Sequence, residues 1–198
     1  MISIPKAFSS TFAQARIKFL EAAATAGLSV QSNAHPLKDL AMDVARDGPM
    51  MASSLLIINS ACHGAEGFCG SGVQVHALHD ADWLKKARAS GTAVLYIHAL
   101  NPYGFSHLRR TTHENVDLNR NFQDFAQPLP DNAAYRAMHD LILPEQWPPD
   151  AANQTAIANF IQTQGQLAYQ SAITQGQHEF AEGMFYGGNS PTWSNHTL

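Results

Sequence analysis

The chain is poor in several features on which whole classes of protein depend. It has two cysteines among 198 residues, too few for the disulfide scaffold of a small secreted domain. It has no apolar run near the roughly 20 residues that a membrane-spanning helix needs. Its N-terminus lacks a charged segment followed by an apolar core and a small-residue cleavage site, the pattern of a signal peptide. We therefore expect a cytoplasmic protein with reduced thiols and no membrane contact.

Positive charge is scarce as well. Lys and Arg number 12 against 16 Asp and Glu, which gives a net charge of -4. The single Arg-Arg pair, Arg109 and Arg110, is too small a basic patch to hold a nucleic acid. The composition therefore argues against a nucleic-acid partner.

The most informative feature that is present is His63-Gly-Ala-Glu66, which follows an apolar run at residues 54–59. A short apolar run ending in a Gly-rich turn is typical of a buried strand, and ligands bind at the carboxyl ends of such strands in open α/β sheets. An imidazole and a carboxylate three residues apart are both good zinc ligands. The alternative is an ordinary ion pair on a surface turn.

A second cluster of polar residues follows another expected strand at residues 92–99. Residues 101–104, Asn-Pro-Tyr-Gly, have the composition of a turn. Arg109 and Arg110 come next, and Asn119 and Arg120 lie shortly beyond. Guanidinium groups and amides are suited to holding a carboxylate. The alternative is that these arginines pair with nearby acidic residues on a solvated loop, where such pairs contribute little.

Together the motifs resemble a known family. H-x-x-E, then N-P-x-G after the next strand, then Arg followed by D-L-N-R-N-F, is similar to the zinc carboxypeptidase superfamily with its aspartoacylase-like relatives, and closest to an uncharacterised bacterial branch. The resemblance runs from about Phe8 to Trp193. It implies an α/β fold of three layers, with a mixed central sheet flanked by helices, and one catalytic domain over residues 1–198.

The resemblance also implies the cofactor and the reaction. It makes His63 and Glu66 two ligands of a catalytic zinc. It implies a hydrolase that cleaves peptide or N-acyl-amino-acid amide bonds next to a free carboxylate. A catalytic zinc needs three protein ligands and one open position, at which it lowers the pKa of water to about 7.

Four further residues receive substrate-directed roles from the same resemblance. Asn119 and Arg120 would bind the carboxylate at the end of a small peptide or N-acyl amino acid. Arg110 would polarise the scissile carbonyl as the catalytic arginine. Arg109 is the alternative for that role and is otherwise expected to bind substrate.

The family's third metal ligand, a late histidine, and its general base, a later glutamate, have no clear match. His178 and His196 come late enough for the ligand, and Glu179 and Glu182 for the base, but all four lie in polar segments. The other histidines are expected to be structural: His35, His76, His79, His98, His107, His113 and His139.

Length supports an incomplete catalytic domain, since family members have roughly 300 residues by resemblance and only two strands are clear here, plus a possible short one at 29–32. We expect this chain to be the N-terminal part of a longer protein. The DNA beyond the Leu198 codon should then encode a strand that ends in His, often preceded by Asp.

The helices expected are one capped by Thr11 and Gln14 and ended by Gly27, then 71–79, 132–143 and a long one over 151–174. The aromatic, Gly-rich residues 183–193 are expected to form a loop lining the substrate pocket.

Two hypotheses follow from the sequence. The first is the zinc-dependent hydrolase described above. The second is a non-catalytic relative that binds a carboxylate-bearing ligand, since two ligands seldom hold a catalytic zinc tightly. Metal content and turnover distinguish them.

Overall fold

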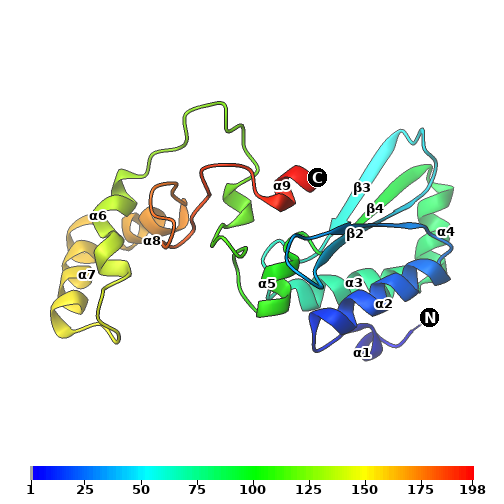
Figure 1. The fold of residues 1–198 in the computed structure, drawn as a ribbon, viewed down its shortest axis with the longest axis horizontal. Coiled ribbons are helices and arrows are strands. Elements are labelled where there is room, and N and C mark those ends of the chain that lie inside the picture. Colours follow the sequence, from blue (N-terminus) through cyan, green and yellow to red (C-terminus); the bar gives the residue numbers. More distant parts are fainter. Residues whose placement is uncertain (1) are drawn as a thin grey trace. The chain divides into compact units, whose positions relative to one another are not determined.

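The computed structural model describes residues 2–198 and divides them into two compact units. The first unit consists of residues 2–113 with Thr197 and Leu198, and the second is Glu114–His196. The first contains the β-sheet, and the second is built from helices and long loops (Figure 1). No helix among residues 2–198 combines the length and apolar character needed to cross a bilayer.

The sheet of the first unit has four strands and is mixed, as predicted. Its strands lie in the order β1-β2-β4-β3; only β3 and β4 run parallel, and the other neighbours are antiparallel. The strand bounds are Val30–Ala34 for β1, Ala41–Asp47 for β2, Ser54–Asn59 for β3 and Thr92–His98 for β4. The α/β fold class with a mixed sheet is therefore confirmed.

Strand β2 was missed by the sequence analysis, which counted too few strands. Its alternation is obscured because Asp43 and Asp47 occupy buried positions where apolar residues are usual. Each carboxylate has an arginine partner: Arg16 Nε lies 2.7 Å from Asp43, and Arg88 Nε lies 2.9 Å from Asp47. Pairing of this kind allows a charge to be buried within a strand.

Four helices of the first unit, α1 to α4, lie on one side of the sheet (Figure 1). Helix α2 has its predicted cap, since Thr11 Oγ1 accepts from Gln14 N, and the left-handed Gly27 follows its end at φ +76°. The predicted helix 71–79 begins earlier than expected, at Gly67. The helix bounds are Ile4–Ala7 for α1, Phe12–Thr25 for α2, Gly67–Leu78 for α3, Ala81–Ala89 for α4 and Pro102–His107 for α5.

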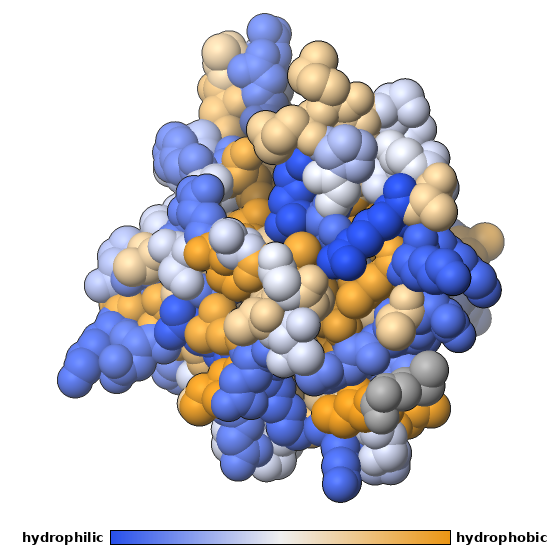
Figure 2. Space-filling view, turned by 90° about the vertical axis from the view of Figure 1, so that its right-hand side faces the viewer, coloured by the Kyte–Doolittle hydropathy of each residue, from blue (hydrophilic) through white to orange (hydrophobic). Residues whose placement is uncertain are grey.

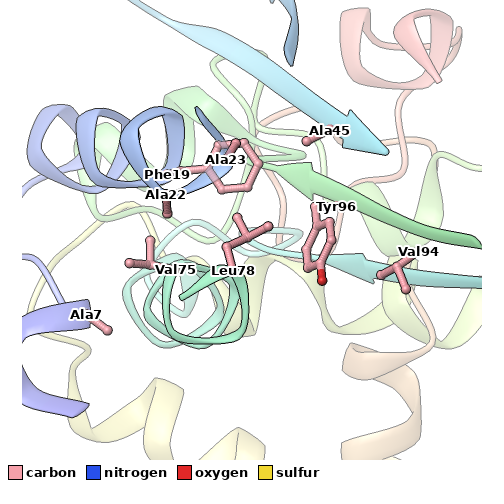
Figure 3. Close-up of a cluster of buried hydrophobic side chains, with 9 residues drawn as sticks. All are labelled: Ala7, Phe19, Ala22, Ala23, Ala45, Val75, Leu78, Val94 and Tyr96. Atoms are coloured by element: carbon pink, nitrogen blue, oxygen red, sulfur yellow. The ribbon is translucent and has the colours of Figure 1, made fainter. Parts of the chain in front are cut away.

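The main core lies between α2, α3 and the sheet (Figure 3). Phe19 from α2 and Leu78 from α3 meet Tyr96 from β4, and small residues such as Ala22 allow the helices to approach closely. Tyr96 also accepts a hydrogen bond of 2.8 Å from Trp83 Nε1, so its hydroxyl is satisfied although the ring is fully buried. Burial raises the pKa of Tyr96.

The other face and the outer edge of the sheet are partly exposed at β3. Ile58 packs on the helix side, so Leu55 and Ile57 point to the opposite face, where they are 55% and 51% exposed. Leu56 is 40% exposed although it faces the helices. Figure 2 shows that apolar residues come to the surface among hydrophilic ones on the side it presents. Within the described residues of the first unit, the apolar strand β3 therefore ends the sheet uncovered.

The second unit contains a 3-10 turn and the remaining helices. Asn132 caps α6 by accepting from Tyr135 N, as the predicted helix 132–143 requires. The single helix predicted over 151–174 is wrong, because Gly165 adopts φ +91° and divides it. The bounds are Leu118–Arg120 for η1, Ala133–Ile142 for α6, Ala151–Gln164 for α7, Gln166–Thr174 for α8 and Trp193–Thr197 for α9.

His98 is buried at the end of β4, and its structural role agrees with the expectation from the sequence. Its Nε2 lies 2.9 Å from Ser71 Oγ, and its ring stacks on Phe19 at 4.7 Å between centroids. It is the ladder partner of Asp43, and its side chain has no exposed surface. Burial outweighs the nearby carboxylate and lowers the pKa of His98 to about 4.

This shift predicts a loss of stability in mild acid. In the unfolded chain, His98 is protonated near its ordinary pKa of 6.5, whereas in the native state it is protonated only near pH 4. The free energy of unfolding should therefore fall by about 3 kcal/mol from this group between these pH values. Urea unfolding across this pH range measures the slope. His98→Gln should flatten the slope, whereas His107→Gln, at an exposed position of α5, should not; equal slopes in all three proteins would contradict the assignment.

Candidate functional site

The loops that follow β3 and β4 leave the sheet side by side. Parallel pairing continues beyond both strands, since Leu100 N donates to Ser60 O and Asn101 N donates to Ala61 O, each at 2.9 Å. The His63 loop and the Asn101 loop therefore begin at the same edge of the sheet. This is the carboxyl edge at which ligands bind in open α/β folds.

His63 and Glu66 face one another on the loop before α3. His63 Nδ1 lies 3.8 Å from Glu66 Oε1; the His63 side chain is 15% exposed and that of Glu66 is 68% exposed. Two atoms at this separation can contact one ion, because zinc binds nitrogen and oxygen ligands at about 2.0–2.2 Å. The donor set fits a divalent metal. Among residues 2–198, no group of three or more His, Cys, Asp or Glu side chains is placed to hold one.

Three of the four late candidates for the third ligand and the base have other partners in the second unit. His178 Nδ1 lies 2.6 Å from the Gly188 carbonyl oxygen, and Glu179 is paired with Arg136 at 2.6 Å. Glu182 lies 3.6 Å from His139. His196 is exposed on α9.

The Asn-Pro-Tyr-Gly motif is the start of α5 and not the turn that its composition predicts. Asn101 Oδ1 accepts from Gly104 N at 2.8 Å, which caps the helix. A Cβ at Gly64 would lie 1.8 Å from the Gly104 carbonyl carbon, so only glycine allows the His63 loop to approach α5 this closely. The motif thus fixes the His63 loop against the segment that carries the arginines.

Arg109 and Arg110 are anchored to this assembly through their backbones. Gly64 N donates to Arg109 O at 3.1 Å, and Asn101 Nδ2 donates to Arg110 O at 3.3 Å. Both arginines are exposed residues. The two motifs of the first unit therefore place His63 and a pair of guanidinium groups on adjoining loops.

Asn119 and Arg120 belong to the second unit, on η1. Asp117 caps this turn by accepting from Asn119 N at 3.0 Å. Arg120 donates from Nη2 to Thr174 O at 2.6 Å and from Nη1 to Asn119 O at 3.1 Å. Its Nε is buried and has no hydrogen-bond partner among the described residues. Every contact of this cation is thus with a neutral carbonyl, which leaves its charge without a carboxylate partner in the described chain.

Arg120 lines a cavity of about 190 Å³ within the second unit. Its lining also includes the amides of Asn119 and Gln123 and the imidazole of His178. No Asp or Glu of the described chain lines it, so Arg120 gives the cavity its only formal charge. Such a cavity favours an anion of small size.

Asn121 holds this unit together, and the sequence analysis assigned it no role. Its Nδ2 donates to Gly187 O at 2.9 Å and Ser190 O at 3.0 Å, and its Oδ1 accepts from Thr192 N at 2.9 Å. The residue is fully buried. It attaches the D-L-N-R-N-F motif to the aromatic, Gly-rich segment 183–193. The only signal available was its place within that motif.

The six predicted site residues are distributed over both units. The predicted metal ligands and the two adjacent arginines lie in the first unit, and the predicted carboxylate-binding residues lie in the second. These residues are His63, Glu66, Arg109 and Arg110 in the first unit, and Asn119 and Arg120 in the second.

The mixed four-stranded sheet and the helices packed on it define an α/β chain. Over residues 8–198 the chain matches, and belongs to, the family described as "Protein of unknown function (DUF2817)". No curated protein matches the chain.

Two solved structures are similar to the chain, each with a TM-score of 0.45. One, from Shewanella denitrificans and described as a "putative metallopeptidase", is 22% identical and is matched over 55% of this chain and 39% of its own. The other, from Burkholderia mallei and described as a "putative carboxypeptidase", is 16% identical and is matched over 75% of this chain and 46% of its own. The chain therefore spans less than half the length of either protein.

Proposed function

We propose that this chain forms part of a metal-dependent hydrolase that cleaves peptide or N-acyl-amino-acid amide bonds next to a free carboxylate. The observation that carries the proposal is the His63–Glu66 pair at the carboxyl edge of the sheet, hydrogen-bonded through its loop to the arginine segment. The cation-lined cavity of the second unit supports the carboxylate part of the proposal.

His63 and Glu66 would hold the metal, and zinc is the metal that we propose. One nitrogen and one oxygen ligand suit zinc and also other divalent ions. When bound, such a metal supplies a Lewis acid and a water of lowered pKa. Its third protein ligand would come from residues after Leu198.

The arginines and the amide would act on the substrate. Arg110, or Arg109 in its place, would stabilise the oxyanion that develops on the scissile carbonyl, an interaction for which removal of one donor costs about 3 kcal/mol. Asn119 and Arg120 would hold the substrate carboxylate, since Arg120 has only carbonyl partners within the described chain. Positioning the carboxylate also positions the neighbouring amide bond.

A second candidate function is a non-catalytic module that binds a carboxylate-bearing ligand. It is favoured by one observation: no described residue completes a set of three metal ligands. It needs Asn119 and Arg120 but not the metal pair.

We also propose that residues 1–198 are the N-terminal portion of a single catalytic domain that has further strands. The free outer edge of β3 and the exposure of Leu55 and Ile57 support this, because exposed apolar strand edges are usually paired or covered.

Arg120→Ala in the complete protein should chiefly weaken the binding of substrates with a free carboxylate. The guanidinium forms paired hydrogen bonds with a carboxylate and has no such geometry with an amide. Comparing kcat/KM for free-acid and amidated forms of one substrate measures the effect, and a loss of about tenfold or more is expected for the free acid alone. Arg136→Ala, which removes an arginine already paired with Asp131 and Glu179, is the matched control. Equal losses on both substrates would refute the clamp.

Zinc binding by the 198-residue chain tests the metal pair. We expect weak zinc binding, because two protein ligands are present, and we expect His63→Ala to abolish it. Titration calorimetry with His107→Ala as the exposed-histidine control measures both. One tightly held zinc that His63→Ala removes would show a third ligand within this chain. Zinc binding unaffected by His63→Ala would overturn the assignment of the pair.

The DNA beyond the Leu198 codon tests the incomplete domain. It should encode a strand that ends in His, often preceded by Asp. Sequencing the genomic locus decides the matter; a natural stop codon or unrelated sequence there would contradict the proposal.

A further inference from the structure

The cavity beside Arg120 contains one side chain that the carboxylate clamp does not use, the imidazole of His178. The ring borders two adjoining cavities of about 190 Å³ each, which share His178 and Pro130. In the second of these, Arg136 is paired with Asp131 and Glu179. The cation without a carboxylate partner is thus on the Arg120 side of the ring, whereas the other cavity has two carboxylates for its one arginine.

The hydrogen bonds of His178 fix which nitrogen carries the proton. Nδ1 lies 2.6 Å from the Gly188 carbonyl oxygen, and a carbonyl can only accept, so Nδ1 is the donor. In the neutral ring Nε2 is then an acceptor. Its one contact is the Gln123 amide at 3.3 Å, a long distance for a hydrogen bond. Nε2 therefore has capacity for a shorter bond from a ligand.

The chain is shaped to keep the ring in this place. A Cβ at Gly187 would lie 2.1 Å from His178 Cε1, so the glycine is needed for the ring to lie against the backbone. The carbonyl of the same glycine accepts from Asn121, and Gly188 adopts φ +77° to direct its own carbonyl at Nδ1. Gly187 thus leaves room for the His178 ring, and Gly188 supplies the carbonyl that orients it.

The arginine that lines the same cavity is equally constrained. A Cβ at Gly176 would lie 2.5 Å from Arg120 Cδ and 2.7 Å from Nε, and Gly176 has φ +89°. The guanidinium lies against this glycine, and its buried Nε–H has no partner in the described chain. One cavity is therefore lined by a cation whose hydrogen bonds go only to carbonyls and by an imidazole whose acceptor makes one long contact.

We propose that His178 is a substrate-binding residue that selects carboxylates carrying an N–H or O–H donor close to the carboxylate. The inference rests on the proposed function, in which Arg120 holds the carboxylate. His178 Nε2 accepts the donor's hydrogen bond, and the Gln123 amide gives way to it. A purely aliphatic acid of the same shape leaves Nε2 with its long contact only and binds less well.

Two matched pairs of small acids test this with the 198-residue chain. Lactate is compared with isobutyrate, and β-hydroxybutyrate with isovalerate; each pair exchanges a hydroxyl for a methyl group. Dissociation constants come from chemical-shift titration by NMR. The hydroxy acid of at least one pair should bind about three- to tenfold tighter, the range expected for one net hydrogen bond.

His178→Asn is the informative variant, because its amide can still donate to Gly188 O while the acceptor at Nε2 is removed. It should bring the ratio of the two constants in the selective pair to about one. Gln123→Leu is the second variant; it removes the competing amide and should raise the ratio. If His178→Asn does not fold, Gln123→Leu still tests the inference.

The outcomes separate this inference from the proposed function. Equal binding of hydroxy and aliphatic acids by the unaltered chain overturns the role of His178 alone. So does a preference that survives His178→Asn or that Gln123→Leu abolishes. If no acid binds, or if all bind as well after Arg120→Gln, the carboxylate clamp fails and the inference fails with it.

Discussion

The parallel pairing of β3 with β4 is the constraint on which the candidate metal site depends. It runs from Ser54 opposite Thr92 to Asn59 opposite Ile97 and continues into the loops through Ser60 and Ala61. A parallel pair needs a crossover, here α3 and α4, so the loops after both strands leave at one edge. Without this pairing, the His63 loop and the arginine segment would not leave the sheet at the same edge.

Buried polar side chains around β3 and β4 determine how α3 packs on these strands. Gln74 Nε2 donates to the carbonyls of Ile58 and Ile97, which joins α3 to both parallel strands. Ser71, one turn earlier on α3, contacts His98 at the end of β4. A buried polar group left without its partner costs about 1–3 kcal/mol, so these contacts favour one placement of α3 over others. The helix that begins at the His63 loop is thereby fixed.

The helix caps and strands whose signals lie within a few residues were predicted correctly from the sequence. The cap at Thr11, the cap at Asn132 and the two apolar parallel strands all carry their signal within a few residues. Strand β2 did not, because the arginines that make its buried aspartates tolerable lie 27 and 41 residues away. The break at Gly165 was missed for a different reason: a single glycine within a helical pattern is compatible with continuation.

The candidate site shows the same division. The motifs gave six candidate site residues by type and order, but the structural roles of Gly64 and Asn121 depend on approaches between distant segments. His178 was considered as a metal ligand because of its late position. Its partners, Gly188 and Gln123, lie 10 and 55 residues away along the chain and could not be inferred from spacing.

The open edge of β3 connects stability to the completion of the site. Fully covering a Leu or Ile side chain contributes about 1.5–3 kcal/mol, so half-exposed Leu55 and Ile57 each leave on the order of 1 kcal/mol unrealised. A further strand paired parallel to β3 would cover them in part. It would also end at the same edge as Asn59, since parallel strands share their carboxyl edge, and its last residues would then lie beside the His63 loop. One added strand would thus cover the apolar edge and bring a third ligand to the metal pair, so folding and metal binding would be completed together.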